Sequence, residues 1–579
     1  MRNQQQRRAL SIWSVLCFSF LSVCGLHAGS LRVDVAHSYG NQPLMLNSLR
    51  YGSEEKHSIS RLSYLCSEFS LLREDGVWVN VANQFAYVDV AKRRTRFQLN
   101  NVPEGNYKSL KFSIGVPKKE NHSDPAIYAA DHPLNPNLNQ LHWDWTGGYI
   151  FLALEGKYHD AKQDLKGFVY HLANDAQLSQ VTVDCRFRVK HRTGLTLRFD
   201  VERLLNQPRQ ISFQKDGAST HSHAGDPIAS ALVANLTSVF SFITVQYPEG
   251  EAPVAAVKPL YLPEKYTPFG FKMSKRFPRP ALPRDNPLLV ERVELGKKLF
   301  HDKRLSKDQS ISCASCHSEE TAFSDSRQFS LGVKGRLGKR HSMPLFNLAW
   351  KSSFFWDGRA GSLREQVLMP IQDHLEMDMD LEKLEALLKA DPEYQSAFAK
   401  AFSGDDVTTE KMALALENFL LTLTSYNSKF DKAMAGKGKL SELEQRGMQL
   451  FFSEYEPRSG SYGADCFHCH GGADFSDHQF HNNGLAARGT DQGRFDFTKL
   501  ESDKLKFSTP SLRNLTKTAP YMHDGRFKTL EEVIEHYSGP MAHSETLDAN
   551  LAKHPKLGLQ LKDEDKKALV AFLRSLSSE

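Results

Sequence analysis

Two motifs of the form CxxCH are the strongest chemical signal in this chain. They read CASCH at residues 313–317 and CFHCH at residues 466–470. Two thiols at this spacing add to the two vinyl groups on one edge of a porphyrin, and the adjacent histidine then lies under the iron. Only 8 Cys and 23 His occur among 579 residues, so two chance copies are improbable, which disfavours disulfide or zinc cysteines. We therefore expect two covalently bound c-type haems.

The motifs give each of their reactive side chains a role. The residues expected to attach the haems are Cys313, Cys316, Cys466 and Cys469, and those expected to bind the irons are His317 and His470. Function then depends on the opposite face of each iron, because an open face binds peroxide whereas a filled face carries electrons. An enzyme and an electron-transfer protein are both compatible with the motifs alone.

Apolar residues of the C-terminal half recur with the 3.6-residue period of a helix. The clearest groups are Leu289, Val293 and Phe300; Leu381, Leu384 and Leu388; and Leu569, Phe572 and Leu573. Each haem motif lies in its own block, one at residues 284–437 and the other at residues 438–579. This pattern predicts a mostly α-helical half made of two cytochrome c-like units.

The N-terminal half shows the period-two alternation of β-strands instead. The alternation is plainest at residues 195–201, and similar runs occur at 85–90, 110–116, 149–154 and 180–189. Many short strands joined by Gly, Pro and Asn turns favour an all-β sandwich or barrel over residues 29–247. Residues 248–283 hold eight of the 25 prolines, which predicts an extended linker between the two halves.

The first 28 residues have the pattern of an export signal. A basic start that ends in Arg7 and Arg8 precedes an apolar stretch and then small residues. We therefore expect a periplasmic or otherwise exported protein, with a lipid anchor at Cys24 as a variant of this prediction. In an oxidising compartment the two remaining cysteines, Cys66 and Cys185, are expected to form a disulfide, with buried free thiols as the alternative.

Charge and hydropathy exclude two further classes of protein. The formal net charge of +5 includes three arginines among the first eight residues, which leaves no strong positive field for nucleic acid. After residue 28 no stretch has the 18 or more apolar residues that a membrane-spanning helix needs. The composition is that of an ordinary globular protein, which excludes a disordered or collagen-like chain.

Three stretches around the haem motifs resemble the bacterial dihaem cytochrome c peroxidases and their MauG-like relatives. They are LFHDKRLS at residues 299–306, FWDGRA at 355–360 and PYMHDG at 520–525. The resemblance implies that Gln366, Pro370 and Glu376 lie over the open face of the first haem. It also implies that Trp356 lies between the two haems, where an indole lets an electron cross in two short steps.

The chemistry of peroxide cleavage agrees with that placement of Glu376. The O–O bond breaks heterolytically when one group removes a proton from the iron-bound oxygen and delivers it to the leaving oxygen. A buried carboxylate can do both, with Gln366 as a neutral donor that positions the peroxide. A solvated surface carboxylate is the ordinary alternative for any Glu, and His374 is an alternative distal base or ligand.

The same resemblance concerns the second haem and a calcium ion. Ordinary peroxidases of this family have a methionine as the distal ligand of that haem, whereas here Tyr537 occupies the corresponding position, which is the MauG-like pattern. A phenolate is a hard anionic donor that lowers the potential of the iron. The alternatives are His536 and Met541, or a Tyr537 that only packs in the core. The calcium ligands that the resemblance implies are Asn347, Thr518 and Pro520.

The β-rich half resembles the MbnP-like periplasmic copper proteins. The run consists of HPLNP at 132–136, LHWDW at 141–145, GY at 148–149 and EG at 155–156. In that family a partner MauG-like enzyme oxidises a tryptophan to kynurenine, so Trp143 and Trp145 are the candidate targets. Copper favours imidazole nitrogen, and the candidate ligands are His37, His132, His142, His171 and His223, with His221 beside the last.

Three functions follow from these observations. The first is an exported dihaem oxidase that uses hydrogen peroxide to oxidise a tryptophan of its own copper-binding β-domain, within one chain or between two. The second is a cytochrome c peroxidase that reduces hydrogen peroxide with electrons from an external donor. The third is a dihaem electron-transfer protein with an attached copper store, against which an open first haem argues.

Overall fold

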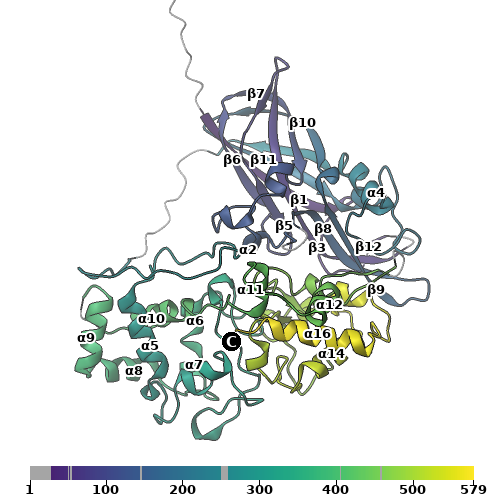
Figure 1. Ribbon diagram of the computed structural model, residues 1–579. Helices are drawn as coiled ribbons and strands as arrows, with labels where there is room; N and C mark the ends of the chain where they lie inside the picture. The colour runs from purple at the N-terminus through teal and green to yellow at the C-terminus, as the bar shows by residue number, and fades with distance from the viewer. Residues whose placement is uncertain are drawn as a thin grey trace, which may run out of the picture.

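The computed structural model describes residues 28–578 except 50, 53–54, 144–146, 249–258, 405 and 457–459. Nearly all of the expected export signal, with Cys24, and the candidate Trp145 lie outside the described residues. Figure 1 shows a β-domain, purple to blue, that sits on a helical half coloured teal to yellow. The predicted fold classes of both halves are confirmed: the first is rich in strands, and the second is helical with cytochrome c units.

The β-domain consists of two facing sheets around one hydrophobic core. The smaller sheet has the order β13-β11-β1-β2, with β6 also paired to β1, and the larger has the order β10-β7-β3-β8-β9-β12, with β4 and β5 paired to β3. The strands are β1 (Ala28–Tyr39), β2 (Gln42–Pro43), β3 (His57–Arg73), β4 (Trp78–Asn80), β5 (Ala86–Asp89), β6 (Arg96–Pro103), β7 (Gly105–Ile114), β8 (Ile150–His159), β9 (Leu165–Ala173), β10 (Ser179–Val189), β11 (Arg192–Asp200), β12 (Ser219–Thr220) and β13 (Phe240–Gln246).

The alternation of apolar and polar residues explains the strands of this domain. In β10 every second side chain is buried, from Ser179 through Val183 to Val189, because successive side chains of a strand face opposite sides of the sheet. The predicted strand at residues 195–201 ends one residue early. Asp200 accepts a hydrogen bond from the backbone of Glu202 and so caps a helix, α3 (Val201–Asn206). The other helices of the domain are α1 (Lys118–Asn121), α2 (Pro136–Asn139) and α4 (Pro227–Leu236).

The predicted disulfide between Cys66 and Cys185 is wrong, because both residues are buried free thiols. Cys66 lies on β3 and pairs with Ile114, at the end of β7. Cys185 lies on β10, directly after Asp184, which pairs with Ser109 in the middle of β7. Strand β7 separates the two cysteines, so their Cα atoms lie at least about 10 Å apart. A disulfide needs a Cα separation of roughly 4.4–6.8 Å.

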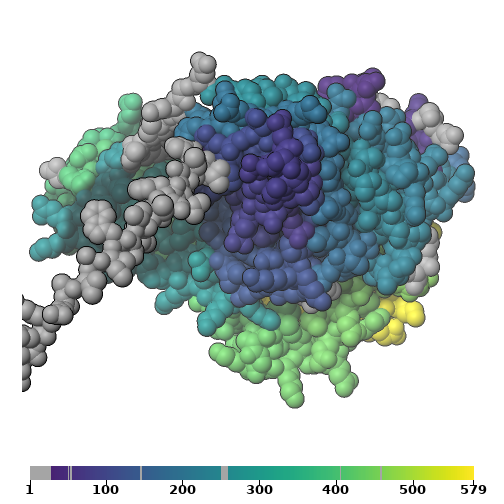
Figure 2. Space-filling view, turned by 90° about the horizontal axis from the view of Figure 1, so that it is seen from above, coloured from purple at the N-terminus to yellow at the C-terminus, as the bar shows by residue number. Residues whose placement is uncertain are grey.

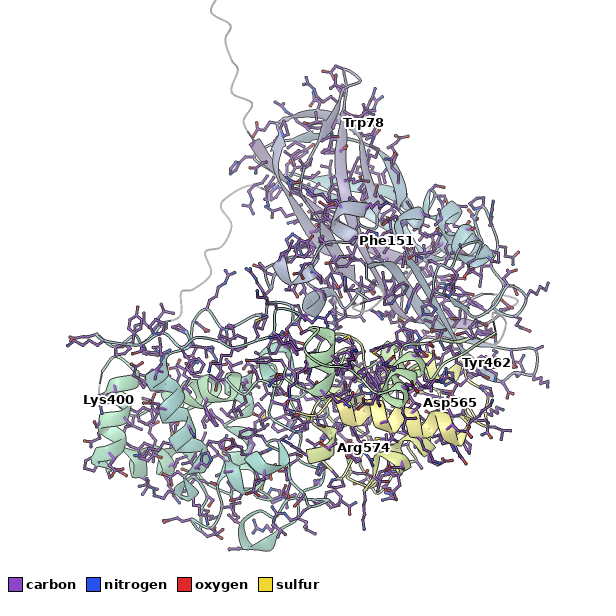
Figure 3. All side chains as sticks on the ribbon, viewed as in Figure 1. Trp78, Phe151, Lys400, Tyr462, Asp565 and Arg574 are labelled. Carbon is purple, nitrogen blue, oxygen red and sulfur yellow. The ribbon has the colours of Figure 1, made fainter. Side chains whose placement is uncertain are left out.

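A smaller core lies on the outer face of the large sheet, under the loop at residues 116–149. Phe151 and Tyr149 are fully buried there, and Trp143 packs against the cluster while remaining partly exposed. Figure 3 shows Phe151 in the part of the β-domain nearer the helical half, and Trp78 at the far end. The loop that carries the MbnP-like residues therefore lies on the side that faces the haem units.

The helical half contains two pairs of long helices and several short ones. The helices are α5 (Val290–His301), α6 (Leu363–Gln366), α7 (Met369–Gln372), α8 (Leu381–Lys389), α9 (Pro392–Ala401), α10 (Thr409–Leu421), α11 (Lys429–Met434), α12 (Glu442–Phe451), α13 (Phe495–Thr498), α14 (Leu530–Ser538), α15 (Ala549–Ala552) and α16 (Asp563–Ser575). Two short antiparallel strand pairs, β14 (Tyr455–Glu456) with β15 (Ser461–Tyr462) and β16 (Phe480–His481) with β17 (Phe507–Ser508), lie between the helices.

In each haem unit the first long helix packs closely on the last one. A Cβ atom at Gly296 of α5 would lie 2.0 Å from the carbonyl oxygen of Ala415 in α10. A Cβ atom at Gly447 of α12 would lie 1.9 Å from the carbonyl oxygen of Ala568 in α16. Only glycine permits such an approach between two backbones. In each unit a glycine therefore lies where the two terminal helices approach most closely.

The β-domain rests directly on the helical half, as Figure 2 shows from above. Gly167 of β9 approaches the backbone of Ala549 in α15, where a Cβ atom would lie 1.9 Å from the Ala549 oxygen. Gln140 donates to the carbonyl of Asp477, and Asn135 donates to the carbonyl of Arg279 at 3.1 Å. Backbone contact and hydrogen bonds at several points therefore fix the interface.

The proline-rich segment also contacts the helical half in its described part. The indole of Trp350 donates to the carbonyl of Pro278 at 2.7 Å, and Phe277 is buried beside Trp350. Arg292 of α5 donates to the carbonyls of Leu260 and Tyr261. Within the part of the chain that the structure describes, no helix is long and apolar enough to cross a membrane.

Candidate functional site

The two expected proximal histidines have the same environment. Nδ1 of His317 lies 2.9 Å from the carbonyl oxygen of Phe323, and Nδ1 of His470 lies 3.0 Å from that of Phe475. An Nδ1–H donor to a backbone carbonyl fixes the tautomer and leaves Nε2 free to bind a metal. Both phenylalanines have positive φ angles, 59° and 51°, so the same turn presents each carbonyl. Both units thus prepare an imidazole for iron.

A cavity of about 880 Å³ lies beside the first motif. Cys313, Cys316 and His317 line one part of it, so the thiols and the imidazole face a space that suits a large cofactor. The residues expected over the open face of the haem, Gln366, Pro370 and Glu376, line the same cavity, and so does Trp356, which was expected between the two haems. The donor set and the cavity therefore fit a covalently attached c-type haem.

Glu376 has the electrostatics of a proton-transfer group. Burial raises its pKa to about 7, the negative charge of Asp373 adds to the shift, and Arg359 opposes it. The backbone fixes the residue, since Glu376 donates to the carbonyl of Asp373 at 3.0 Å and accepts from Val333 at 2.8 Å. A pKa near neutrality suits a group that must take up and release a proton. His374 lines the cavity as well, but its side chain is 73% exposed.

A break between two short helices positions Gln366 and Pro370. Ser362 caps α6, which ends at Gln366, and α7 starts at Met369 with Pro370 at its second position. Proline has no N–H and is tolerated only in the first turn of a helix. The chain therefore turns at this point and brings both residues to the cavity wall.

Trp356 connects the first cavity with the second haem unit. Its indole N–H donates to the carbonyl of His341 at 2.8 Å, and its backbone carbonyl accepts from Ser508 of β17 at 2.7 Å. Its ring centre lies 6.5 Å from that of His523, which stacks on Phe507 at 3.6 Å. Trp356 is thus buried between the first cavity and the 507–523 region.

Tyr537 lies on α14 and receives a hydrogen bond at its hydroxyl from the amide of Asn483 at 3.1 Å. Burial raises the pKa of Tyr537, the bond from Asn483 opposes this shift, and the thiols of Cys469 and Cys466 add to it. The tyrosine therefore lies near the haem-attachment loop. The alternative ligand His536 instead contacts the carbonyl oxygen of Asn483 with its Nε2, at 3.0 Å.

Two methionines near this site have different surroundings. The alternative ligand Met541 is buried, 8% exposed, beside Gly484. Met522, which the sequence reading did not consider, accepts from the same Asn483 amide at 3.7 Å that donates to Tyr537. The sequence signal that could have identified Met522 is its position in the PYMHDG motif.

The expected calcium ligands are linked through a shared neighbour, Ser425. No direct contact among them defines a site. Asn347 is buried and bonds through its amide to Ser425 and, at 2.6 Å, to Asp474. Thr518 follows a turn whose first residue, Asn514, donates to the hydroxyl of the same Ser425 at 3.0 Å. Pro520 follows two residues later, and calcium binding by this set stays a prediction.

The five expected copper ligands do not come together. His37 is partly buried on β1, with Nε2 3.0 Å from the Tyr64 hydroxyl, and His132 stacks on Tyr128. His223 is exposed. Only His142 and His171 line a shared cavity, of about 100 Å³, between the β-domain and the second haem unit.

Trp143 lines this interdomain cavity as well. A short turn holds it, since Trp143 donates to the carbonyl of Gly148 and accepts from Gly147, both at 2.9 Å. Phe467 and His468 of the second haem motif form the opposite wall. The sequence reading missed His468, because the CxxCH pattern allows any residue at its third position and therefore gives no signal there.

Comparison with known proteins matches three parts of the chain to three family models. Residues 290–439 match the family model "Di-haem cytochrome c peroxidase", residues 446–577 match "Cytochrome c", and residues 28–222 match "MbnP". The MauG protein of methylamine utilization from Methylophilus methylotrophus is 35% identical over 306 residues, which cover 52% of this chain and 88% of MauG. The cytochrome c551 peroxidase of Pseudomonas aeruginosa is 34% identical over 306 residues, or 51% of this chain and 81% of the peroxidase.

Among solved structures, a MauG-like protein associated with microbial copper homeostasis is 34% identical. Its TM-score is 0.48, and the match covers 54% of this chain and 96% of that protein. The family expected for each half is confirmed, as is the expectation of two haems. The helical half of this chain therefore belongs to the di-haem cytochrome c peroxidase and MauG family of peroxide-dependent oxidoreductases, and its N-terminal half is an MbnP domain.

Proposed function

We propose that this chain is an exported enzyme that uses hydrogen peroxide to oxidise Trp143 of its own β-domain to kynurenine. The position of Trp143 supports the proposal most directly. Its ring centre lies 5.9 Å from that of His221, and it lines one cavity together with Phe467 and His468. The target indole therefore lies against the attachment loop of the second haem.

The overall reaction balances with two molecules of hydrogen peroxide for each tryptophan. The indole loses four electrons, its C2–C3 bond breaks and two carbonyl groups form, which gives N-formylkynurenine. Each peroxide accepts two electrons, and two molecules of water are released. Hydrolysis then removes the formyl group as formate. The haems, when bound, supply the redox-active iron for this chemistry.

Glu376 moves the proton at the peroxide end of the molecule. With a pKa of about 7, it accepts a proton from hydrogen peroxide and returns it to the departing oxygen as water forms. Gln366, on the same cavity wall, holds the peroxide as a neutral donor. Removal of the Glu376 carboxylate is expected to stop oxidation of Trp143 while leaving haem attachment intact.

Trp356 and Trp143 mark the two ends of the electron path. Trp356 lines the peroxide cavity and lies 6.5 Å from His523 of the second unit, measured between ring centres. Trp143 lines the interdomain cavity together with Phe467 and His468 of that unit. Because the two domains are one polypeptide, the effective concentration of the target reaches the millimolar range without a tight separate interface.

Three further features belong to the same proposal. Residues 1–28 direct export, the oxygen atoms of Asn347, Thr518 and Pro520 hold a calcium ion, and the β-domain binds copper. Hard oxygen donors suit calcium, and imidazoles suit copper.

A peroxidase that draws electrons from an external donor is the second candidate, because the cytochrome c551 peroxidase of Pseudomonas aeruginosa is a relative. The interdomain contacts disfavour it. Phe467 and His468 of the second haem motif face the β-domain, so a small donor protein cannot reach this side of the loop.

Peptide mass spectrometry tests the proposal. Residues 120–157 form one tryptic peptide, which contains both Trp143 and Trp145. Holoprotein is analysed before and after hydrogen peroxide, beside Glu376→Gln, Trp143→Phe and Trp145→Phe. We expect a kynurenine mass that persists in Trp145→Phe and disappears in the other two. Unmodified tryptophan in a holoprotein that consumes peroxide would favour the second candidate.

A further inference from the structure

Three histidines from both halves of the chain converge at the domain interface. His171 lies on β9, His221 directly follows β12, and His468 ends the second haem-attachment turn. Each offers one ring nitrogen, and the three nitrogens lie within 4.8 Å of one another. We propose that His171, His221 and His468 bind one zinc or copper ion that joins the β-domain to the second haem unit.

The ring positions match a three-histidine metal site. The ring centres lie 5.1 Å apart for His171 and His221, 5.2 Å for His221 and His468, and 5.9 Å for His171 and His468. Metal–nitrogen bonds of about 2.0 Å place each ring centre about 3.2 Å from the ion, so tetrahedral ligands have centres about 5.2 Å apart. Ligand nitrogens in such a site lie about 3.3 Å apart, so the three nitrogens move together by about 1.5 Å at most when the ion binds.

Two of the three imidazoles have a buried nitrogen without a hydrogen-bond partner. These atoms are Nδ1 of His171 and Nε2 of His221, and the two side chains are 4% and 9% exposed. A buried polar atom without a partner costs free energy, which a metal ion recovers by binding it. Nε2 of His171 contacts Glu155 at 2.9 Å, the carboxylate contact that orients metal-binding histidines.

One carboxylate lies between two of the three rings. Glu454 has its Oε2 2.9 Å from Nε2 of His468 and 3.3 Å from Nε2 of His221. The side chain of His468 is 3% exposed, so these contacts are shielded from water. Glu454 and Glu155 are already paired with Lys553 and Arg61, so the imidazole nitrogens, rather than a free carboxylate, are the groups that would hold the ion.

The other two groups of metal-binding side chains at this interface do not have the same capacity. In the group formed by Glu454, Asp465 and His468, the ammonium of Lys553 already contacts both carboxylates. In the group that contains Cys469, both ring nitrogens of His481 contact carboxylates, at 2.7 and 2.6 Å. The three-histidine cluster differs from both, because Nδ1 of His171 has no hydrogen-bond partner and Nε2 of His221 has only the 3.3 Å contact with Glu454.

This site differs from a copper site confined to the β-domain, because one ligand comes from the helical half. Bound metal would therefore tie β9 and the segment after β12 to the second haem motif. The inference goes beyond the proposed tryptophan oxidation and does not depend on it, since it concerns binding of an ion in the absence of peroxide.

Metal analysis of the holoprotein tests the site. Protein with both haems attached is stripped with a chelator, loaded with ZnCl₂ or CuCl₂ alone, passed through a desalting column and measured by mass spectrometry against its haem iron. We expect one zinc or copper ion for every two irons in the wild type. His221→Leu should retain less than a tenth of that amount, and the control His191→Ala, whose exposed side chain precedes β11, should retain all of it.

Hydrogen exchange provides the second measurement. Zinc should slow exchange at residues 165–173 and at residues 466–470 together in the wild type, and at neither segment in His221→Leu. His468→Phe serves as a further variant if its haem content equals that of the wild type. Equal metal retention in His221→Leu and the wild type, or a wild type that retains neither ion, would overturn the assignment.

Discussion

The two haem units repeat one scaffold over a long stretch. The loop FWDGR at residues 355–359 has its counterpart in MHDGR at residues 522–526, and each loop begins with a positive-φ residue, Phe355 or Met522. In each loop the Asp pairs with the Arg, at 3.0 Å in the first unit and 2.6 Å in the second. Each loop is closed by a single antiparallel bridge. Upstream, Asn347 and Asn514 start equivalent turns, both with left-handed backbones.

The two units differ in the helix that follows that loop. Ser362 and Thr529 cap helices at equivalent positions of the two units. Pro370 and Tyr537 follow these caps at the same interval, so the two residues occupy corresponding positions. In the first unit the helix stops at Gln366, and Pro370 brings no ligand atom to the cavity. In the second unit α14 continues to Ser538, and Tyr537 presents its hydroxyl near the haem-attachment loop.

The two units therefore share the environment of the proximal histidine and differ in the helix that follows a Ser or Thr cap. Pro370 and Glu376 line the cavity of the first unit, whereas the second unit has Tyr537 at the position of Pro370. Under the proposed function, the length of this helix separates peroxide chemistry in the first unit from electron storage in the second.

The largest effect is expected from Glu376→Gln, which removes the proton acceptor from the first unit only. Loss of a positioned general base lowers a rate by about 10²- to 10⁴-fold. The measurement is the rate at which the holoprotein consumes hydrogen peroxide when no external electron donor is present. Glu382→Gln, on the exposed face of α8, is the control. A decrease of less than about threefold would assign the proton transfer to another group.

Tyr537→Phe tests the second unit in the same way. Removal of the hydroxyl should raise the potential of the second haem and lower Trp143 oxidation by about 10- to 100-fold, while the initial peroxide reaction changes little. Redox titration and peptide mass spectrometry measure the two effects. Tyr462→Phe is the control, because Tyr462 is 65% exposed (Figure 3).

The reciprocal variant makes the comparison sharper. Pro370→Tyr places a hydroxyl where the first unit has none, so peroxide consumption should fall while haem attachment persists. An unchanged redox potential in Tyr537→Phe, together with an unchanged peroxide rate in Pro370→Tyr, would contradict the equivalence of positions 370 and 537.

The shared helix packing predicts a smaller, matched pair of effects. Gly296→Ala and Gly447→Ala each force a Cβ atom against a carbonyl oxygen of the partner helix. Each should lower the free energy of unfolding by about 1–3 kcal/mol, the usual cost of overpacking. Denaturant unfolding of the holoprotein measures both, with Gly270→Ala as the control because a Cβ atom there meets nothing within 4 Å. A large effect in only one unit would show that the two helix pairs pack differently.

The success of the sequence predictions depended on whether the pattern was local. Periodicity predicted α5, α8 and α16 and the strands β5, β7, β8, β10 and β11 of the sandwich, because burial of one face imposes its period on a short segment. The resemblance to the MauG-like enzymes implied that Gln366, Pro370 and Glu376 lie on one face of the first haem, and the three residues line one cavity. The pairing of strands that are far apart in the sequence leaves no such local pattern.

The errors concern residues that only tertiary structure brings together. Nothing in the spacing of Cys66 and Cys185 shows that β7 runs between their strands. Residue type alone grouped His37, His132 and His223 with His171, although the fold distributes them over separate faces. The sequence did not point to His468, because its role depends on how the β-domain docks on the helical half. No single segment of the sequence encodes that docking.

The smallest effect is a shift in pH dependence that only the first unit should show. Glu376 acts as a base when ionised, so the peroxide rate should fall about tenfold per pH unit below its pKa of about 7 and level off above it. Asp373→Asn removes the like charge that helps to raise this pKa, so the midpoint should move to lower pH and the variant should be faster than the wild type near pH 6. Asp378→Asn, whose carboxylate pairs with Lys307, serves as the control, because its charge is not among the causes of the Glu376 shift. A midpoint that moves equally in both variants would mean that general surface charge, rather than the Asp373 carboxylate, sets the ionisation of the distal base.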